Sequence, residues 1–296
     1  MRRQIQQTPA IHAFTEWQPG LDCEIALVTD QGCVRALGLP QEDSRGQHWE
    51  RQMNGVLHSD ERSPMTEANP RQNVTFPSNG RQAHGYLNKP DRGSGPGLIV
   101  IEEWWGLDDH IADLVDRFAA EGFVTLAPDY FGGRVAHQTD AAAKMLEELP
   151  VDQAARDLAG AVDYLLADPD VTSKSLGVIG FCVGGGFALQ MAAQQGDRIN
   201  AAVAFYGVGP AVPDQYRTVT APIQGHYGEQ DAMYPVDQAH AQERQIRDES
   251  AGSVEFFYYP AGHAFHNDKD RLGTYNQELA SLAWSRAVAF LKDNAQ

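Results

Sequence analysis

The chain has 296 residues, 42% of them hydrophobic, which is enough to bury the core of one large domain or two small ones. Its formal net charge of −17 argues against nucleic acid and anionic membrane surfaces as partners, because like charges repel one another. The sequence contains neither an apolar run of the roughly 18 residues that a membrane-spanning helix needs nor a signal peptide, so we expect no membrane association and a cytoplasmic location.

The N-terminal part of the chain, residues 1–70, differs in composition from the rest. It is polar and rich in glutamine, with little sustained periodicity, which predicts an extension that is poorly ordered or not native. The segments CEIALVTD and CVRALGL predict a hairpin around Gln31 and Gly32, although a lone hairpin is only marginally stable in water. Met65 opens a stretch that reads like the beginning of a domain, so a translation start at Met65 is an open alternative.

Residues 71–296 show the alternation of strands and helices that is typical of an α/β domain. Strands separated by helices of about ten or more residues predict βαβ crossovers and a mostly parallel central sheet with helices on both faces. A hairpin at 73–90 is predicted to turn at Ser78-Asn79-Gly80. The remaining strands are expected at 97–103, 123–129, 175–180, 199–207, 221–228 and 254–260, and the helices at 108–122, 140–149, 152–168, 184–196, 237–250 and 275–293.

Reactive side chains follow four of the predicted strands. Glu102 and Glu103 end the first buried strand, and Cys182, Asp231 and His263 follow three later ones. Because catalytic groups collect at the carboxyl ends of parallel strands, we expect these side chains to lie close together. The chain has three cysteines and no CxxC pair, too few for a disulfide framework, so we expect Cys182 to be reduced.

The segment GFCVGGG, residues 180–186, places a cysteine between a strand and a helix. Its spacing is that of a nucleophile elbow with cysteine in place of serine, in which Gly180 and Gly184 leave room for a strained turn. The helix N-terminus would favour a thiolate, and the backbone N–H of Val183 would be one oxyanion donor. The alternatives are a glycine-rich turn around an inert cysteine and a phosphate-binding loop, but the segment lacks the lysine and the serine or threonine of a P-loop.

An acid and a histidine follow the cysteine in the chain order nucleophile, acid, base. His263 is placed to take the thiol proton, and Asp231 to hold the imidazole ring in the required tautomer. Asp231 could instead cap the following helix, for which Asp237 is the better-placed residue. His226 and His266 are alternatives to His263, which we favour because it directly follows a strand in a glycine-containing loop.

From about Val74 to the C-terminus the sequence resembles the dienelactone hydrolase family (carboxymethylenebutenolidases), which has the α/β-hydrolase fold. The segments that carry the resemblance are IEEWWGLDDHI, APDYFGG, GFCVGG, YGEQDAMYPVDQ and AGHAFHND. The resemblance implies a thiol hydrolase with a triad of Cys182, Asp231 and His263, which opens a lactone or enol ester through an acyl-enzyme.

The same resemblance implies a role for a glutamate after the first buried strand. Glu103, three residues before Gly106, matches the glutamate that helps to generate the thiolate when substrate arrives, and Trp104 would supply the second oxyanion N–H. Glu102 and Glu103 face opposite ways in an extended strand, so only one can reach the cysteine, and position alone does not choose between them. A carboxylate near the thiol disfavours the thiolate, so a resting neutral thiol that is activated on binding is physically sensible.

Aromatic side chains near these strand ends predict the walls of a substrate pocket, although aromatic residues also form cores. Family members that take dienelactone hold its carboxylate with arginines, one of them four residues after the triad histidine, where this chain has Asn267. Arg271, Lys269 and Arg134 are alternatives for that role, although solvated surface charge is the commoner state of such residues. The pocket candidates are Trp104, Trp105, Tyr130, Phe131, Phe265 and Asn267.

The sequence therefore predicts a hydrolase that acts on a lactone or small ester, as a monomer or small homo-oligomer. We expect no cofactor and no metal, because the chain has no HExxH segment and no metal-ligand spacing stands out around its histidines. The alternatives on the same fold are a redox-sensing thiol protein, for which no resolving cysteine lies nearby, and a non-catalytic binding protein.

Overall fold

The computed structural model describes residues 28–29, 32–33, 69 and 71–296, and the chain divides between Glu67 and Ala68 into two units. In the first unit, Val28–Thr29 (β1) and Gly32–Cys33 (β2) pair as antiparallel strands, with Val28 opposite Cys33. This pairing is the predicted hairpin. Apart from these strands and Asn69, the predicted extension of residues 1–70 and the alternative start at Met65 lie outside the described residues.

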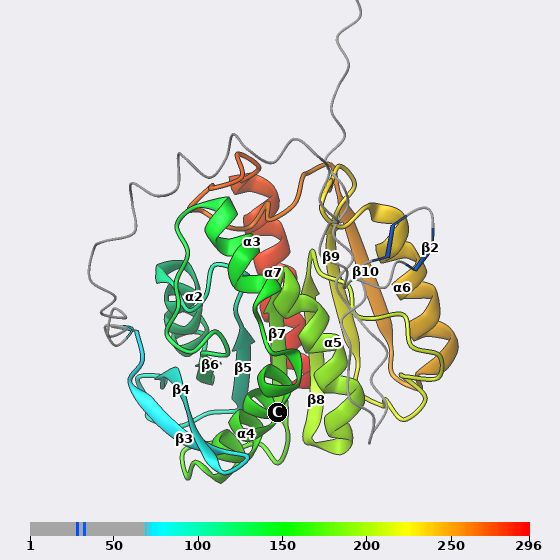
Figure 1. Cartoon of the computed structure of the whole chain (residues 1–296). Helices are drawn as coiled ribbons and strands as arrows, with labels where there is room; N and C mark the ends of the chain where they lie inside the picture. The colour runs from blue at the N-terminus through cyan, green and yellow to red at the C-terminus, as the bar shows by residue number, and fades with distance from the viewer. Residues whose placement is uncertain (1–27, 30–31, 34–68, 70) are drawn as a thin grey trace, which may run out of the picture. The chain divides into compact units, whose positions relative to one another are not determined.

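The second unit is built on one sheet of eight strands (Figure 1). The strands are Val74–Ser78 (β3), Arg81–Asn88 (β4), Gly97–Ile101 (β5), Val124–Pro128 (β6), Leu176–Phe181 (β7), Ile199–Phe205 (β8), Ile223–Gly228 (β9) and Val254–Tyr259 (β10). Their order across the sheet is β10-β9-β8-β7-β5-β6-β4-β3, with parallel pairing from β10 to β6. β4 is antiparallel to β6, and β3 is antiparallel to β4. The mostly parallel sheet confirms the predicted α/β class.

The hairpin β3–β4 turns where the sequence predicts it. Asn79 has a φ of 42° and Gly80 a φ of 78°, the left-handed conformations that a two-residue type I′ turn requires at both central positions. Asparagine and glycine tolerate these angles better than other residues, so this pair sets the register in which Ser78 lies opposite Arg81.

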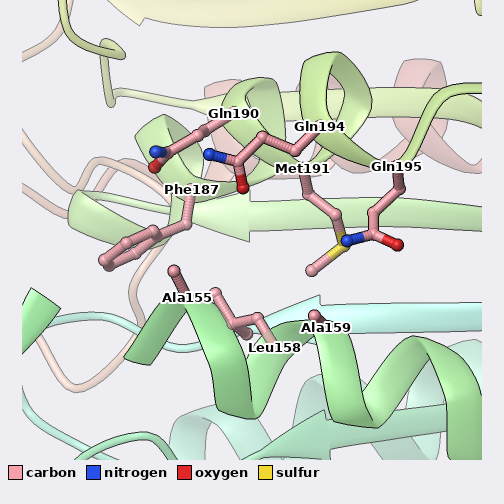
Figure 2. A pocket seen from close by; sticks show the side chains of 8 residues that line it. All are labelled: Ala155, Leu158, Ala159, Phe187, Gln190, Met191, Gln194 and Gln195. Atoms are coloured by element: carbon pink, nitrogen blue, oxygen red, sulfur yellow. The ribbon is translucent and has the colours of Figure 1, made fainter. Parts of the chain in front are cut away.

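Helices cover both faces of the sheet, as predicted (Figure 1). On one face α2 and α7 pack together, with the rings of Phe118 and Trp284 4.4 Å apart. On the other face α4 and α5 lie side by side, and Figure 2 shows Leu158 of α4 and Phe187 of α5 lining the shallow groove between them. None of the predicted site residues lines this groove. The helices are Asp109–Ala120 (α2), Thr139–Glu147 (α3), Val151–Ala167 (α4), Val183–Gln195 (α5), Val236–Glu249 (α6) and Gln277–Asn294 (α7).

The central strands are apolar because both of their faces are covered. Every residue of β5, β6 and β7 is buried, whereas the edge strand β10 has a single buried residue, Tyr259. Strands covered on both faces have continuous apolar sequences rather than alternating ones, which explains the run GLIVI at β5. This rigid centre places the carboxyl ends of β5, β7, β8 and β9 at one edge of the sheet.

We predict that Phe118→Ala lowers the free energy of unfolding by about 3–5 kcal/mol, because it leaves a cavity between α2 and α7. Phe118 is fully buried and packs against the rings of Phe123 and Trp284. The matched control is Leu282→Ala on α7, which is 43% exposed and should lose less than about 0.5 kcal/mol. Urea unfolding followed by circular dichroism measures both values, and equal losses would contradict this packing.

Candidate active site

Cys182 lies in a strained turn between β7 and α5. Its φ is 54° and its ψ −125°, a conformation that costs energy for any residue with a side chain. The neighbouring glycines permit the turn, because a Cβ on Gly180 would lie 1.9 Å from the carbonyl oxygen of Gly184, and one on Gly184 would lie 2.5 Å from that of Glu102. The backbone therefore has the geometry of the predicted elbow, and α5 begins at Val183 with its N-terminus beside the sulfur.

The side chains of Cys182, His263 and Asp231 form one hydrogen-bonded chain. His263 lies between the other two, with Nε2 3.2 Å from the sulfur and Nδ1 2.7 Å from Oδ2 of Asp231. The second oxygen of Asp231 accepts hydrogen bonds from the backbone N–H groups of Met233 and Tyr234, both at 2.8 Å. All three members of the chain are buried, and the sulfur-bearing residue is only 2% exposed.

The alternatives considered for the acid and the histidine have other positions. Neither Asp231 nor Asp237 caps α6, whose N-cap is Pro235 with no side-chain hydrogen bond, so the capping alternative and the preference for Asp237 as the cap were wrong. His226 is bonded to the hydroxyl of Tyr259 and to Gln224.

The other competing histidine, His266, lies in the core between α2 and α7. Its ring packs against those of Phe181, Phe205 and Trp284. Burial, together with the neighbouring His110, lowers the pKa of His266 well below its ordinary value, so this ring stays neutral. No hydrogen bond joins it to the sulfur in the part of the chain that the structure describes.

Electrostatics favour a protonated His263. Burial acts to lower the pKa of its ring, but the sulfur of Cys182 and the carboxylate of Asp231 outweigh burial and raise the pKa to about 10. The ring therefore carries a positive charge at neutral pH and lies between the carboxylate of Asp231 and the sulfur of Cys182.

Glu103 is turned toward this chain of residues, and Glu102 is turned away. One oxygen of Glu103 accepts from the hydroxyl of Tyr206 at 2.9 Å, and the other accepts from the amide nitrogen of Asn267 at 2.6 Å. The ring of Tyr206 lies 5.2 Å from that of His263. Both oxygens are therefore held by neutral donors, and within the described residues Glu103 makes no hydrogen bond to Cys182.

Glu102 is a buried carboxyl group on the opposite side of the strand end. Among the described residues no side chain donates a hydrogen bond to its oxygens, and it is fully buried rather than solvated or capping a helix. Burial, followed by the nearby Asp129 carboxylate, raises the pKa of Glu102 well above its ordinary value. Glu103 is therefore the glutamate that faces the site.

The backbone N–H groups predicted to bind an oxyanion, those of Val183 and Trp104, lie after the ends of the neighbouring strands β7 and β5. Val183 is the first residue of α5, where a backbone N–H has no partner within the helix. Trp104 directly follows Glu103 beyond the end of β5.

The predicted pocket aromatics are all buried, but their surroundings differ. Trp104 and Trp105 pack edge to face with their rings 5.2 Å apart, and Tyr130 packs on Phe131 at 4.7 Å. Phe265 lies in the main core between Tyr206 and Tyr259, so its packing is that of a core residue. A small hollow beside the histidine loop is lined by Trp105, Ala264, Asn267, Asp270, Arg271, Leu272 and Thr274.

The cationic residues suggested as holders of a substrate carboxylate are paired with protein carboxylates. The guanidinium of Arg271 is 2.7 Å from Asp108 and lies over the ring of Trp105 at 4.8 Å. Lys269 pairs with Asp268 at 3.8 Å. Arg134 is bound to Glu148 at 2.8 Å on the surface.

Two tyrosines beside His263 were missed at the level of sequence. Tyr206 directly follows β8 and has a φ of 39°, a strained angle that is compatible with its hydrogen bond to Glu103. Tyr234 follows β9 by a short loop, and its ring lies 5.5 Å from that of His263. Both stand after parallel strands, so the strand-end rule that selected Cys182 could also have selected them.

Among the described residues, no group of three or more histidine, cysteine, aspartate or glutamate side chains has an arrangement that could hold a metal ion. No helix in this part of the chain combines the length and the apolar character needed to cross a membrane.

Comparison with known proteins gives one family. The model of the dienelactone hydrolase family matches residues 83–295. The chain is 34% identical over 228 residues to "Protein usf" of Aquifex pyrophilus, with 75% of this chain and 98% of that protein aligned. It is 30% identical over 227 residues to a "Putative carboxymethylenebutenolidase" of Aquifex aeolicus, covering 75% of this chain and 97% of that protein.

A solved structure agrees with this result. The crystal structure of a "Putative Dienelactone Hydrolase" from Klebsiella pneumoniae superposes with a TM-score of 0.66 at 29% identity, covering 74% of this chain and 96% of that one.

We predict that the imidazole ring of His263 titrates near pH 10 and that Cys182→Ala shifts this titration downward. The sulfur is one of the groups that raise the pKa, and without it the lowering effect of burial is opposed only by Asp231. The ring is protonated below its pKa, so in the parent protein it should stay charged from pH 7 to about 9. Histidine-selective ¹⁵N NMR measures the midpoint, and identical midpoints in both proteins would contradict the coupling.

Proposed function

The chain belongs to the dienelactone hydrolase family, and we propose that it hydrolyses a lactone or a small carboxylic ester through Cys182, Asp231 and His263. Membership makes the protein a hydrolase of carboxylic esters with the α/β-hydrolase fold. The observation that carries the finer proposal is the contact of 3.2 Å between Nε2 of His263 and the sulfur of Cys182 at a strained strand-to-helix turn.

In the proposed mechanism the sulfur of Cys182 is the nucleophile. It attacks the carbonyl carbon, a carbon–sulfur bond forms, and the carbonyl oxygen becomes an oxyanion. When this intermediate collapses, the bond to the leaving oxygen breaks, and His263 donates its Nε2 proton to that oxygen. The product of this half-reaction is a thioester with a neutral imidazole beside it.

Water completes the cycle. His263 takes a proton from the water molecule as its oxygen attacks the thioester carbon, and the carbon–sulfur bond breaks to release the acid. The sulfur leaves as a thiolate beside a protonated ring, so Cys182 and His263 regain the charges that they had at the moment of attack. A lactone treated in this way yields one hydroxy acid, and an open ester yields an acid and an alcohol.

The oxyanion is proposed to bind the backbone N–H groups of Val183 and Trp104. Val183 begins α5, so the positive end of the helix dipole lies beside the developing charge. Donors of this kind are worth about 10²–10³-fold in rate when they are preorganised.

Glu103 is proposed to act only after its present hydrogen bonds change. Because Cys182 is 2% exposed, a substrate has to displace side chains to reach the sulfur. Displacement of Asn267 or Tyr206 would free one oxygen of Glu103, which could then accept the proton of the thiol and return it to the sulfur after the acid is released. Burial also weakens the redox alternative, since sensor cysteines are solvent-accessible.

We predict that Cys182→Ala lowers the rate of p-nitrophenyl acetate hydrolysis by about 10³-fold or more, because the nucleophile is lost. Cys182→Ser should recover little activity, since a hydroxyl is a far weaker nucleophile beside groups arranged for a thiol. Mass spectrometry of the parent protein quenched during turnover should find the acyl group on Cys182. Full activity in the alanine variant would remove the mechanism.

We predict that Asp231→Asn lowers kcat by about 10²–10⁴-fold, because an amide cannot stabilise the charged ring or fix its tautomer. Asp237→Asn is the matched control: this residue is exposed in the first turn of α6, six positions further on, and its loss should leave kcat unchanged. Steady-state kinetics with the same ester measures both, and equal effects would contradict the role of Asp231.

A further inference from the structure

We propose that this site takes an uncharged ester or lactone and disfavours substrates that carry a carboxylate near the scissile bond; this inference rests on the proposed function. The carboxylate of Glu103 has no cationic partner among the described residues, whereas the cations His263 and Arg271 are already paired with protein carboxylates.

The first observation concerns the carboxyl group of Glu103. It is 1% exposed, and its two oxygens accept hydrogen bonds from Tyr206 and Asn267, which are both neutral. Among the described residues no lysine, arginine or histidine forms an ion pair with it. A substrate carboxylate placed beside Glu103 would meet a like charge in a site where water is scarce, and such repulsion is weakly screened there.

The second observation concerns His263, the cationic group that contacts the sulfur of Cys182. Its ring lies between the sulfur of Cys182 and the carboxylate of Asp231, at 3.2 and 2.7 Å, so both ring nitrogens are occupied. The carboxylate of Asp231 already pairs with the ring, and no ring N–H is left to bind a substrate anion.

The third observation concerns the arginine on the histidine loop. Arg271 has a 19% exposed side chain, and its guanidinium is bound to Asp108, whose side chain is 3% exposed. A substrate carboxylate could recruit Arg271 only by breaking this pair and leaving Asp108 buried without a cation, which is strongly unfavourable. Asp108 also caps α2 through its other oxygen, so it cannot turn away without loss of that cap.

Aromatic rings lie beside His263 and beside the histidine loop. The rings of Tyr206 and Tyr234 pack against His263 at 5.2 and 5.5 Å, and Trp105 lines the hollow beside the histidine loop. Apolar walls with a few neutral polar groups suit an uncharged substrate, because burying an unpaired carboxylate among them is costly.

The test compares two esters with the same leaving group and acyl chain. Mono-4-nitrophenyl glutarate carries a carboxylate, and its methyl ester does not. We expect kcat/KM for the methyl ester to exceed that for the acid at least about tenfold, because only the acid meets the uncompensated charge of Glu103. Equal rates, or a preference for the acid, would overturn the inference.

Substitutions at Asn267 and Arg271 identify the cause of the preference for the uncharged ester. Asn267→Lys places a cation beside Glu103 and should reduce the ratio between the esters at least about fivefold, whereas the uncharged control Asn267→Gln should keep the parent ratio. Arg271→Gln should also keep it. A selective loss of hydrolysis of the acid in Arg271→Gln would show that this arginine holds substrate carboxylates and would overturn the inference.

Binding separates this inference from the proposed function. In Cys182→Ala, the quenching of tryptophan fluorescence should give a dissociation constant for the methyl ester at least about tenfold lower than for the acid. If hydrolysis in the parent does not depend on Cys182 but this difference in binding persists, the proposed mechanism fails and the charge preference stands. Equal affinities would overturn the preference even where Cys182 is the nucleophile.

Discussion

The hydrogen bond between Nε2 of His263 and the sulfur of Cys182 joins groups that are 81 residues apart in the chain, and the parallel sheet makes this meeting possible. β7, β9 and β10 are parallel strands of one sheet and end at the same edge, so the residues that follow them converge there. The buried centre of the sheet holds these ends in fixed register. A chain of two hydrogen bonds through His263 needs that precision, since a shift of one residue in any strand would turn the side chain to the opposite face.

Backbone strain gathers at the same edge. Cys182, Tyr206 and Ala264 all have positive φ angles, although none of them is glycine, and each lies just after a strand or beside the histidine. Such angles persist only where the surrounding structure over-determines them. At Cys182 the restraint includes Gly207, where an added Cβ would lie 1.8 Å from the carbonyl oxygen of Cys182. The packing of the sheet thus supplies the free energy that holds Cys182 and Tyr206 in unfavourable backbone conformations.

The sequence predicted the elements well because they depend on periodicity, and every strand and helix expected between 73 and 296 has a counterpart in the structure. The glycines around Cys182 can be read locally and predicted the strained turn, and the strand-end rule predicted that Cys182, Asp231 and His263 lie at one edge of the sheet. The sequence did not predict the hydrogen bonds of Glu103 or the ion pair of Arg271. Those contacts depend on how side chains from distant loops are oriented, and a strand pattern carries no information about that. The expected cap at Asp237 failed because α6 begins one residue earlier, after Pro235.

In the proposed mechanism, activation of the sulfur and selection by charge depend on the same group, Glu103. A free carboxylate beside the sulfur would oppose the thiolate, and in the resting structure both oxygens of Glu103 are held by Tyr206 and Asn267. The sulfur is then bonded to His263, and the positive ring is stabilised by Asp231 on its other side. Because Tyr206 and Asn267 are neutral, they hold the carboxyl group without cancelling its charge, and that residual charge opposes a second anion in the site. An arginine in place of Asn267 would bind the same oxygen of Glu103 and neutralise the carboxylate. The amide of Asn267 binds that oxygen but leaves the negative charge in place, so the same contact holds Glu103 away from the sulfur and favours uncharged substrates.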